Sequence, residues 1–183
     1  MRDITEKEAV ELLRKYSNNR KKFNAVLNHS RAVQKLAFEI AGDIKENHDV
    51  DIGIVRIGSL LHDIGRFKCY KENSIKHGFV GGEILNKEGL AKYAKIAETH
   101  IGVGITKKDI KEKKLDLPLR DFVPRTTEQK IISYADCLIF GSKMVKISKV
   151  IERFRRELGE RHIERVIKLH NEIEKLRGKN NFL

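Results

Sequence analysis

Residues 59–67 read SLLHDIGRF and bring an apolar helical pattern to an end in a histidine, an aspartate, a glycine and an arginine. The preceding positions that share one helical face are Ile54, Ile57, Gly58 and Leu61. Gly65 is expected to stop this helix in the left-handed conformation that glycine adopts freely. The ionisable pair His62–Asp63 therefore stands where a buried stripe ends, and burying such groups is costly unless they have charged or hydrogen-bonding partners.

The same helical period continues through most of the chain. We expect helices at about 5–16, 23–46, 76–86, 89–99, 126–140 and 145–177, the last one divided at Gly159. A long connection over 101–126 is expected to hold one helical turn capped by Thr106. No alternating run of the strand type is longer than four residues, so the predicted fold class is all-α.

The composition is typical of one soluble globular domain. The chain has 183 residues, of which 40% are hydrophobic and 35% are charged. No apolar run is long enough to span a bilayer and the N-terminal stretch is polar, so we expect a cytoplasmic protein with no membrane contact. Cys69 and Cys137 are expected to be reduced. The abundance of Lys and Glu over Gln is typical of proteins from hot environments.

The seven histidines fall into two groups. His48, His162 and His170 lie in polar or charged surroundings and are expected on the solvated surface. The others stand at helix ends or on apolar faces: His29, His62, His77 and His100. His29, for example, follows Val26 by three residues, a spacing that places both side chains on the same buried face.

Asp136 lies among apolar residues in IISYADCLIF, so its charge needs a metal ion or a basic partner. Imidazole and carboxylate ligands together suit Fe, Mn, Co, Ni or Zn better than Mg or Ca. Adjacent residues diverge by about 100° on a helix, so His62 and Asp63 reach one centre only where the last turn lets the backbone reorient. There the histidine can bind one ion while the carboxylate bridges to a second. We therefore expect one or two divalent ions (Fe, Mn, Co or Ni, with Mg as an alternative).

His29, His62–Asp63 and Asp136, in this order on helices, resemble the HD superfamily of metal-dependent phosphohydrolases. HDIG at 62–65 is the signature of the HDIG subset of that superfamily. The stretches KHGFVGGEIL, THIGVG and EQKIISYAD look closest to the bacterial diadenosine-tetraphosphate hydrolase branch and to uncharacterised archaeal HDIG proteins. No Gly-Tyr-Pro follows the motif, which disfavours the cyclic-dinucleotide HD-GYP branch.

The resemblance covers about residues 23–140. It implies an HD-type helical bundle there, with about 141–183 as a C-terminal helical extension of a single domain spanning 1–183. It also implies a metal centre in which Asp63 bridges two ions. The implied ligands are His29, His62, Asp63 and Asp136 for the first ion, and His77 and His100 with Asp63 for the second.

The implied reaction is hydrolysis of a phosphoester or phosphoanhydride bond of a nucleotide or dinucleotide by metal-activated water. Asp63 and Arg66 are the predicted catalytic residues, and Arg66, where relatives often have lysine, would also bind a phosphate through its fork of donors. Further candidates to bind substrate phosphates are Lys107, Arg125 and Lys143. Lys143 is included because it would lie two helical turns beyond Asp136. Glu83 is a candidate partner for the ring N–H of a metal-binding histidine.

Two other functions stay open. The same order of histidines and aspartates resembles the di-iron oxygenases of the superfamily, which a cluster of cations at the site would disfavour. The formal net charge is +12, and residues 141–183 hold 12 Lys and Arg against 6 Glu, so the chain could instead be an RNA-binding module or an RNA phosphodiesterase. The apolar positions along 145–177 favour packing on the core, or a homodimer through these helices, over RNA binding.

Overall fold

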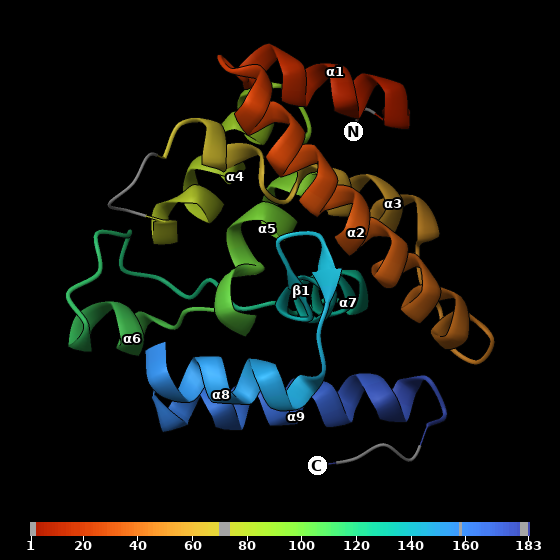
Figure 1. Cartoon of the computed structure of the whole chain (residues 1–183), viewed down its shortest axis with the longest axis vertical. Helices are drawn as coiled ribbons and strands as arrows, with labels where there is room; N and C mark the ends of the chain where they lie inside the picture. Colours follow the sequence, from red (N-terminus) through yellow and green to blue (C-terminus); the bar gives the residue numbers. More distant parts are fainter. Residues whose placement is uncertain (1–2, 70–73, 158, 180–182) are drawn as a thin grey trace.

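The computed structural model describes residues 3–69, 74–157, 159–179 and 183, and these are mostly helical (Figure 1). Helix α2 (Arg20–Lys45) crosses the middle of the molecule. It begins at Asn19, whose side-chain oxygen accepts hydrogen bonds from the backbone N–H groups of Lys21 and Lys22. Its inner face buries Val26, Val33, Leu36, Ala37 and Ile40, as the helical period predicts.

Three helices pack around α2. Helices α3 (Ile52–Leu61) and α7 (Thr127–Cys137) lie directly against it, and α1 (Glu6–Tyr16) packs on both α2 and α3. Helix α1 starts with a capping box in which Thr5 accepts from the N–H of Glu8 while the Glu8 carboxylate accepts from the N–H of Thr5. These helices enclose one large apolar core, which also receives residues from four helices described below.

The remaining part of the core is covered by a helical pair. Helices α4 (His77–Lys87) and α5 (Ala91–Thr99) pack against each other, and α4 also contacts the short 3₁₀ helices η1 (Ile64–Phe67) and η2 (Ser74–Lys76). The chain then enters the long connection that the sequence predicts. It holds η3 (Ile101–Val103) and α6 (Lys107–Glu112), and Thr106 caps α6 as expected. Ile105, Ile110 and Phe122 form a small apolar cluster under this connection.

The prediction of one helix over 126–140 is wrong at its end. Helix α7 ends at Cys137, and a hairpin follows in which β1 (Ile139–Phe140) pairs antiparallel with β2 (Lys143–Met144). Gly141 has a φ of 64°, which allows the chain to reverse here. The predicted all-α class is confirmed, because these two strands are the only ones in the described residues. No helix in those ranges is long and apolar enough to cross a membrane.

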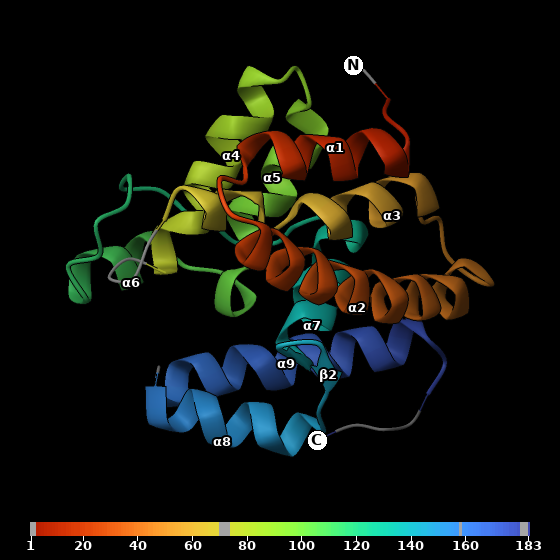
Figure 2. The same ribbon diagram turned by 45° about the horizontal axis from the view of Figure 1, so that its top comes forward.

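The C-terminal part folds into two antiparallel helices, α8 (Ile147–Glu157) and α9 (Glu160–Leu176), which lie side by side along one edge of the molecule (Figure 2). Gly159, with a φ of 86°, divides them at the predicted position. Helix α9 packs on α7, and α8 packs mainly on α9. The apolar positions of both helices in the described residues are thus buried or half-buried within the chain, so the homodimer that the sequence leaves open is not needed to cover them.

Gly65 has a different role from the one that the sequence suggests. Helix α3 ends at Leu61, and Gly65 lies inside η1 with a negative φ. A Cβ at this position would overlap the carbonyl oxygen of His77 and come within 2.6 Å of the backbone nitrogen of Gly81. Glycine is therefore required because η1 and α4 touch through their backbones, and this contact places Asp63 next to His77.

We expect Gly65→Ala to lower the free energy of unfolding by about 2 kcal/mol or more, because the added methyl group must push two backbone segments apart. Gly42→Ala in α2 is the matched control, since a Cβ there meets nothing within 4 Å. It should raise the free energy of unfolding by about 0.5–1 kcal/mol. Denaturant unfolding of both variants measures this, and a Gly65→Ala protein as stable as the wild type would contradict the packing described.

An ion pair holds α9 against the long connection. Arg165 donates from both terminal nitrogens to the carboxylate of the buried Asp109 in α6, with N–O distances of 2.6 and 3.1 Å. Burial opposes ionisation of Asp109, but Arg165 and the hydrogen bonds from Thr106 bring the pKa of this carboxyl well below its usual value. A carboxyl with a lowered pKa in the folded state stabilises the fold above its unfolded pKa, and the stabilisation is lost as the pH falls.

Arg165→Met should lower the free energy of unfolding by about 2–4 kcal/mol at pH 7, because it removes both guanidinium hydrogen bonds from a buried carboxylate and leaves only Arg161, 3.8 Å away. The difference from the wild type should shrink as the pH falls below about 4, the usual pKa of an aspartate, because a protonated Asp109 needs no cation. Guanidinium unfolding at pH 7 and at pH 3 tests this. Arg155→Met, at an exposed pair with Glu160, should cost less than about 1 kcal/mol. An equal loss for Arg165→Met at both pH values would contradict the assignment.

Candidate metal centre

Five separate helical segments place histidines and aspartates at one point of the core. The first histidine comes from α2, the His-Asp pair follows α3, the next two histidines begin α4 and follow α5, and the last aspartate lies in the final turn of α7. The six side chains that meet there are His29, His62, Asp63, His77, His100 and Asp136. These are the six residues that the sequence singles out as metal ligands.

Asp63 lies at the middle of the group. Its Oδ2 is 3.6 Å from Nε2 of His29 and 3.8 Å from Nε2 of His62. Its Oδ1 is 3.1 Å from Nε2 of His77 and 3.4 Å from Nε2 of His100. One carboxylate thus faces two pairs of imidazoles, one with each oxygen, which is the arrangement that a bridging ligand needs.

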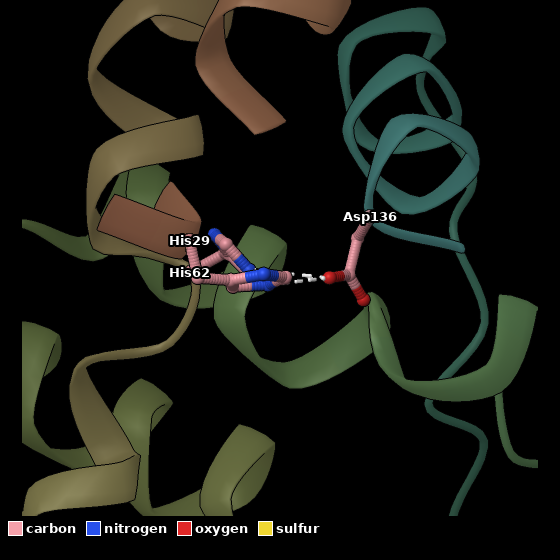
Figure 3. A group of neighbouring side chains, drawn as sticks. All are labelled: His29, His62 and Asp136. Atoms are coloured by element: carbon pink, nitrogen blue, oxygen red, sulfur yellow. Dashed lines mark hydrogen bonds and ion pairs between the residues drawn. The ribbon is translucent and has the colours of Figure 1, made fainter. Parts of the chain in front are cut away.

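Asp136 is a second carboxylate that faces the first pair of imidazoles, those of His29 and His62. Its Oδ1 lies 2.9 Å from Nε2 of His29 and 3.5 Å from Nε2 of His62, and Figure 3 shows both rings pointing at this carboxylate. His29, His62 and Asp136 each offer one ligand atom, and these atoms lie within 4.8 Å of one another. A second such group consists of His62, Asp63 and His100. The donor set is of the imidazole and carboxylate type that suits divalent transition metals.

Backbone carbonyls fix the orientation of three rings. In His29, Nδ1 donates to the carbonyl oxygen of Gly141 at 2.7 Å. Nδ1 of His62 donates to the carbonyl oxygen of Ser59 at 2.7 Å, and Nδ1 of His100 donates to that of Ala97 at 2.8 Å. Because a carbonyl can only accept, each Nδ1 carries the proton and each Nε2 presents its lone pair to the centre when the ring is neutral. This is how proteins orient metal-binding histidines, although the partners here are carbonyls rather than the predicted Glu83, which is exposed.

Two atoms at the centre fit a bound cation. Nε2 of His62 and Oδ1 of Asp63 are fully buried and make no hydrogen bond within the described part of the chain. Leaving a buried acceptor unsatisfied costs about 1–3 kcal/mol, and more for a charged group. Both atoms point into the group of ligands, where a divalent ion would satisfy them. The residues present therefore fit a metal centre.

The ionisation of the two carboxylates and of His100 agrees with this. Burial opposes ionisation of Asp63 and of Asp136, but the neighbouring histidines, with Arg66 beside Asp63, keep the pKa of each carboxyl well below its usual value. Burial lowers the pKa of His100 to about 4, so this ring is neutral near pH 7. Ionised carboxylates and neutral imidazoles are the forms in which these side chains bind metals. His29 differs: burial opposes its protonation, but the hydrogen bond with Asp136 and the charges of Asp136 and Asp63 raise its pKa to about 9, so this ring must release a proton when an ion binds.

Of the predicted phosphate-binding residues, Arg66 is the one that contacts the centre. Its Nε lies 2.5 Å from Oδ2 of Asp63, and its side chain is 44% exposed, so the guanidinium lies between the buried carboxylate and solvent. Lys107 and Arg125 are exposed, and Lys107 is the first residue of α6, directly after the capping residue Thr106. The helical argument for Lys143 is wrong, because α7 ends before this residue is reached and Lys143 lies in β2.

The prediction that His162 and His170 lie on the surface is wrong. Both are buried on the inner side of α9, and Nδ1 of His170 lies 2.7 Å from the hydroxyl oxygen of Tyr134 in α7. His170 follows the buried Val166 by four residues, and this spacing could have predicted its burial.

Two of the carbonyl partners could also have been predicted from the sequence, because Ser59 and Ala97 each lie three residues before the histidine that they accept from. Gly141 is 112 residues from His29, so nothing near His29 in the sequence predicts this contact.

The chain matches the model of the HD domain family over residues 26–141, a range that begins before His29 and ends after Asp136. It therefore belongs to the HD domain family, in the superfamily of metal-dependent phosphohydrolases. The HD domain of the Listeria monocytogenes phosphodiesterase PgpH has the same fold. It superposes with a TM-score of 0.53 at 19% identity, covering 93% of this chain and 97% of that one.

Several archaeal proteins are similar to this chain in sequence. The uncharacterised protein MJ0778 of Methanocaldococcus jannaschii is 48% identical over 155 residues, which cover 82% of this chain and 89% of that protein. The tRNA (cytidine(56)-2'-O)-methyltransferases of Thermoplasma volcanium and Picrophilus torridus are 35% and 33% identical, over 96% and 85% of this chain. The matched segments make up 48% and 43% of these two methyltransferases, so this chain corresponds to less than half of each.

We expect the wild-type chain, reconstituted with Mn²⁺, to hold two ions, and His77→Ala to hold one. His77 and His100 face Oδ1 of Asp63, while the other ligands gather at Oδ2 and Asp136, so loss of His77 should empty one position and spare the other. Mass spectrometry of the metal content measures both, with His48→Ala in an exposed loop as the control. Two ions in His77→Ala, or none in the wild type, would overturn the proposed ligand sets.

Proposed function

We propose that this chain is a metal-dependent phosphohydrolase that cleaves a phosphoester or phosphoanhydride bond of a nucleotide or dinucleotide. The observation that supports this best is the position of Asp63, whose two oxygens each face a pair of histidines. We assign one ion to His29, His62, Asp63 and Asp136, and a second to His77, His100 and the same Asp63. The proposed metals are Fe, Mn, Co or Ni.

Bound divalent ions would supply Lewis-acid stabilisation of phosphoryl oxygens and would acidify a water toward neutral pH. The chain itself supplies the ionised bridging carboxylate of Asp63 and the oriented imidazoles around it. Arg66 is half exposed and already lies against Asp63, so its remaining donors can bind a substrate phosphate beside the centre. We assign catalysis to Asp63 and Arg66, with Arg66 also binding substrate.

Substrate would reach the centre from one side. The side chains of His29 and Asp136 are 14% and 17% exposed, whereas His62, Asp63, His77 and His100 are buried. Arg66 is also open to solvent. A phosphate entering over His29 and Asp136 would therefore meet the open edge of the centre, while the buried ligands stay out of contact with bulk water.

A nucleotide is the substrate class that we favour. The PgpH HD domain, which shares this fold, is also known in complex with cyclic-di-AMP, at 18% identity to this chain. The stretches around His77, His100 and Asp136 resemble the diadenosine-tetraphosphate hydrolase branch. Both support a substrate with linked phosphates. We further propose that residues 1–183 form one domain, since one apolar cluster joins residues from α1 to α9.

RNA is the second candidate for the substrate. Two relatives act on tRNA by name, and this chain matches less than half of each, so the related segment stands beside further sequence in those proteins. We propose on this ground that the metal centre acts on, or next to, an RNA phosphate. The excess of positive charge on the chain supports a polyanionic partner.

The chain loaded in turn with Mn, Fe, Co and Ni should release product from at least one member of a panel of cyclic dinucleotides, dinucleoside polyphosphates, nucleotides and bis-p-nitrophenyl phosphate. Asp63→Asn should lose at least about 100-fold in rate, because it removes the bridging charge. Asp49→Asn, on an exposed loop, should keep full activity. Oxygen uptake by the iron-loaded chain with no cleavage of any phosphoester would instead identify a di-iron oxygenase and overturn the proposal.

A further inference from the structure

A row of lysines begins in the hairpin whose Gly141 contacts His29 of the metal centre. Residues 137–151 contain three lysines and no acidic residue. We define the basic strip as Lys143, Lys146, Lys149 and Arg153. All four side chains are exposed. Arg153 pairs with Glu157 at 2.9 Å, whereas none of the three lysines forms an ion pair with any residue that the structure describes. Like charges in a row repel one another, and an anion that spans them would relieve this repulsion.

The strip follows one edge of α8. The N–H of Lys149 donates to the carbonyl of Lys146, so the helical turn already begins at Lys146. Lys149 and Arg153 follow at spacings of three and four residues, which places the three side chains on the same side of the helix. Val150 and Phe154, the buried residues of α8, face the core instead. From Lys146 to Arg153 the helix rises about 10 Å, the length of roughly three nucleotides of a stacked strand.

The hairpin joins this strip to the open edge of the centre. The guanidinium of Arg153 lies 5.0 Å from the ring centre of Phe140, and Phe140 pairs with Lys143 across the hairpin. The next residue, Gly141, accepts the hydrogen bond from Nδ1 of His29. His29 and Asp136 are the ligands that solvent reaches. The strip therefore leads, through a single hairpin, to the side of the centre that a substrate can enter.

We propose that the basic strip binds the sugar–phosphate backbone of RNA and guides one phosphate of the strand to the metal centre. The inference rests on the proposed function, from which the choice of RNA is taken. Exposed lysines suit phosphates that vary in position along a strand, because an ammonium group binds as a point charge with no fixed orientation. Met144, exposed at the hairpin, adds an apolar contact for a base.

The test measures binding of a labelled tRNA transcript to the full chain by fluorescence anisotropy over a range of salt concentrations. The triple variant Lys143→Gln, Lys146→Gln, Lys149→Gln should bind about 10-fold or more weakly near 0.15 M salt, and its log–log salt slope should be smaller by about 2–3. The control is Lys7→Gln, Lys35→Gln, Lys45→Gln, which removes the same charge from exposed positions of α1 and α2. The control should bind nearly as the wild type does.

Equal loss of affinity in the two triple variants would show that only the net charge matters, and would contradict the proposal that the basic strip is the RNA-binding surface. Duplex DNA of the same length bound as tightly as tRNA would overturn RNA as the partner. Unchanged melting temperature and Mn²⁺ content in the strip variant exclude a folding defect. Hydrolysis by the wild-type chain is assayed separately on bis-p-nitrophenyl phosphate, so an inactive enzyme that still binds tRNA through the strip refutes only the proposed function.

Discussion

The structure depends on neutralising one buried carboxylate. Asp63 is almost fully buried, and its carboxyl is held ionised with Nε of Arg66 2.5 Å away. Four imidazole nitrogens that can hold a cation surround its two oxygens within 4 Å. An isolated charge in such a place would cost many kcal/mol, so the partners must be delivered to it by the fold. Helices α2, α3, α4 and α5 each contribute one imidazole, and α7 contributes the second carboxylate. The helical bundle is thus arranged around this point.

Several local features of the chain follow from that demand. Gly65 has no side chain because η1 and α4 must touch for Asp63 to reach His77. The rings of His62 and His100 are held by carbonyls at the ends of their own helices, but His29 is held by the hairpin that follows α7. The hairpin and the pair α8–α9 therefore do more than cover the core. The hairpin fixes one ligand of the centre, and the basic strip follows it along the chain.

The sequence predicts the helices and the six candidate ligands because both leave local marks. Buried faces recur with the helical period, Thr106 marks the start of α6, and His62–Asp63 is an expensive pair at the end of an apolar stripe. What the sequence does not predict depends on contacts between distant segments. The close approach at Gly65, the hairpin after Cys137 and the carbonyl of Gly141 are of this kind. His170 was misjudged because charged neighbours hid its place on the inner face of α9.

A crystal of the Mn²⁺-loaded chain tests most directly whether Asp63 bridges two metal ions. Anomalous scattering at the manganese edge should show two peaks about 3.5–4 Å apart, a separation typical of two-metal sites. Each peak should contact one oxygen of Asp63, one beside His29, His62 and Asp136 and the other beside His77 and His100. A map with strong manganese peaks elsewhere and none in contact with Asp63 would contradict the account.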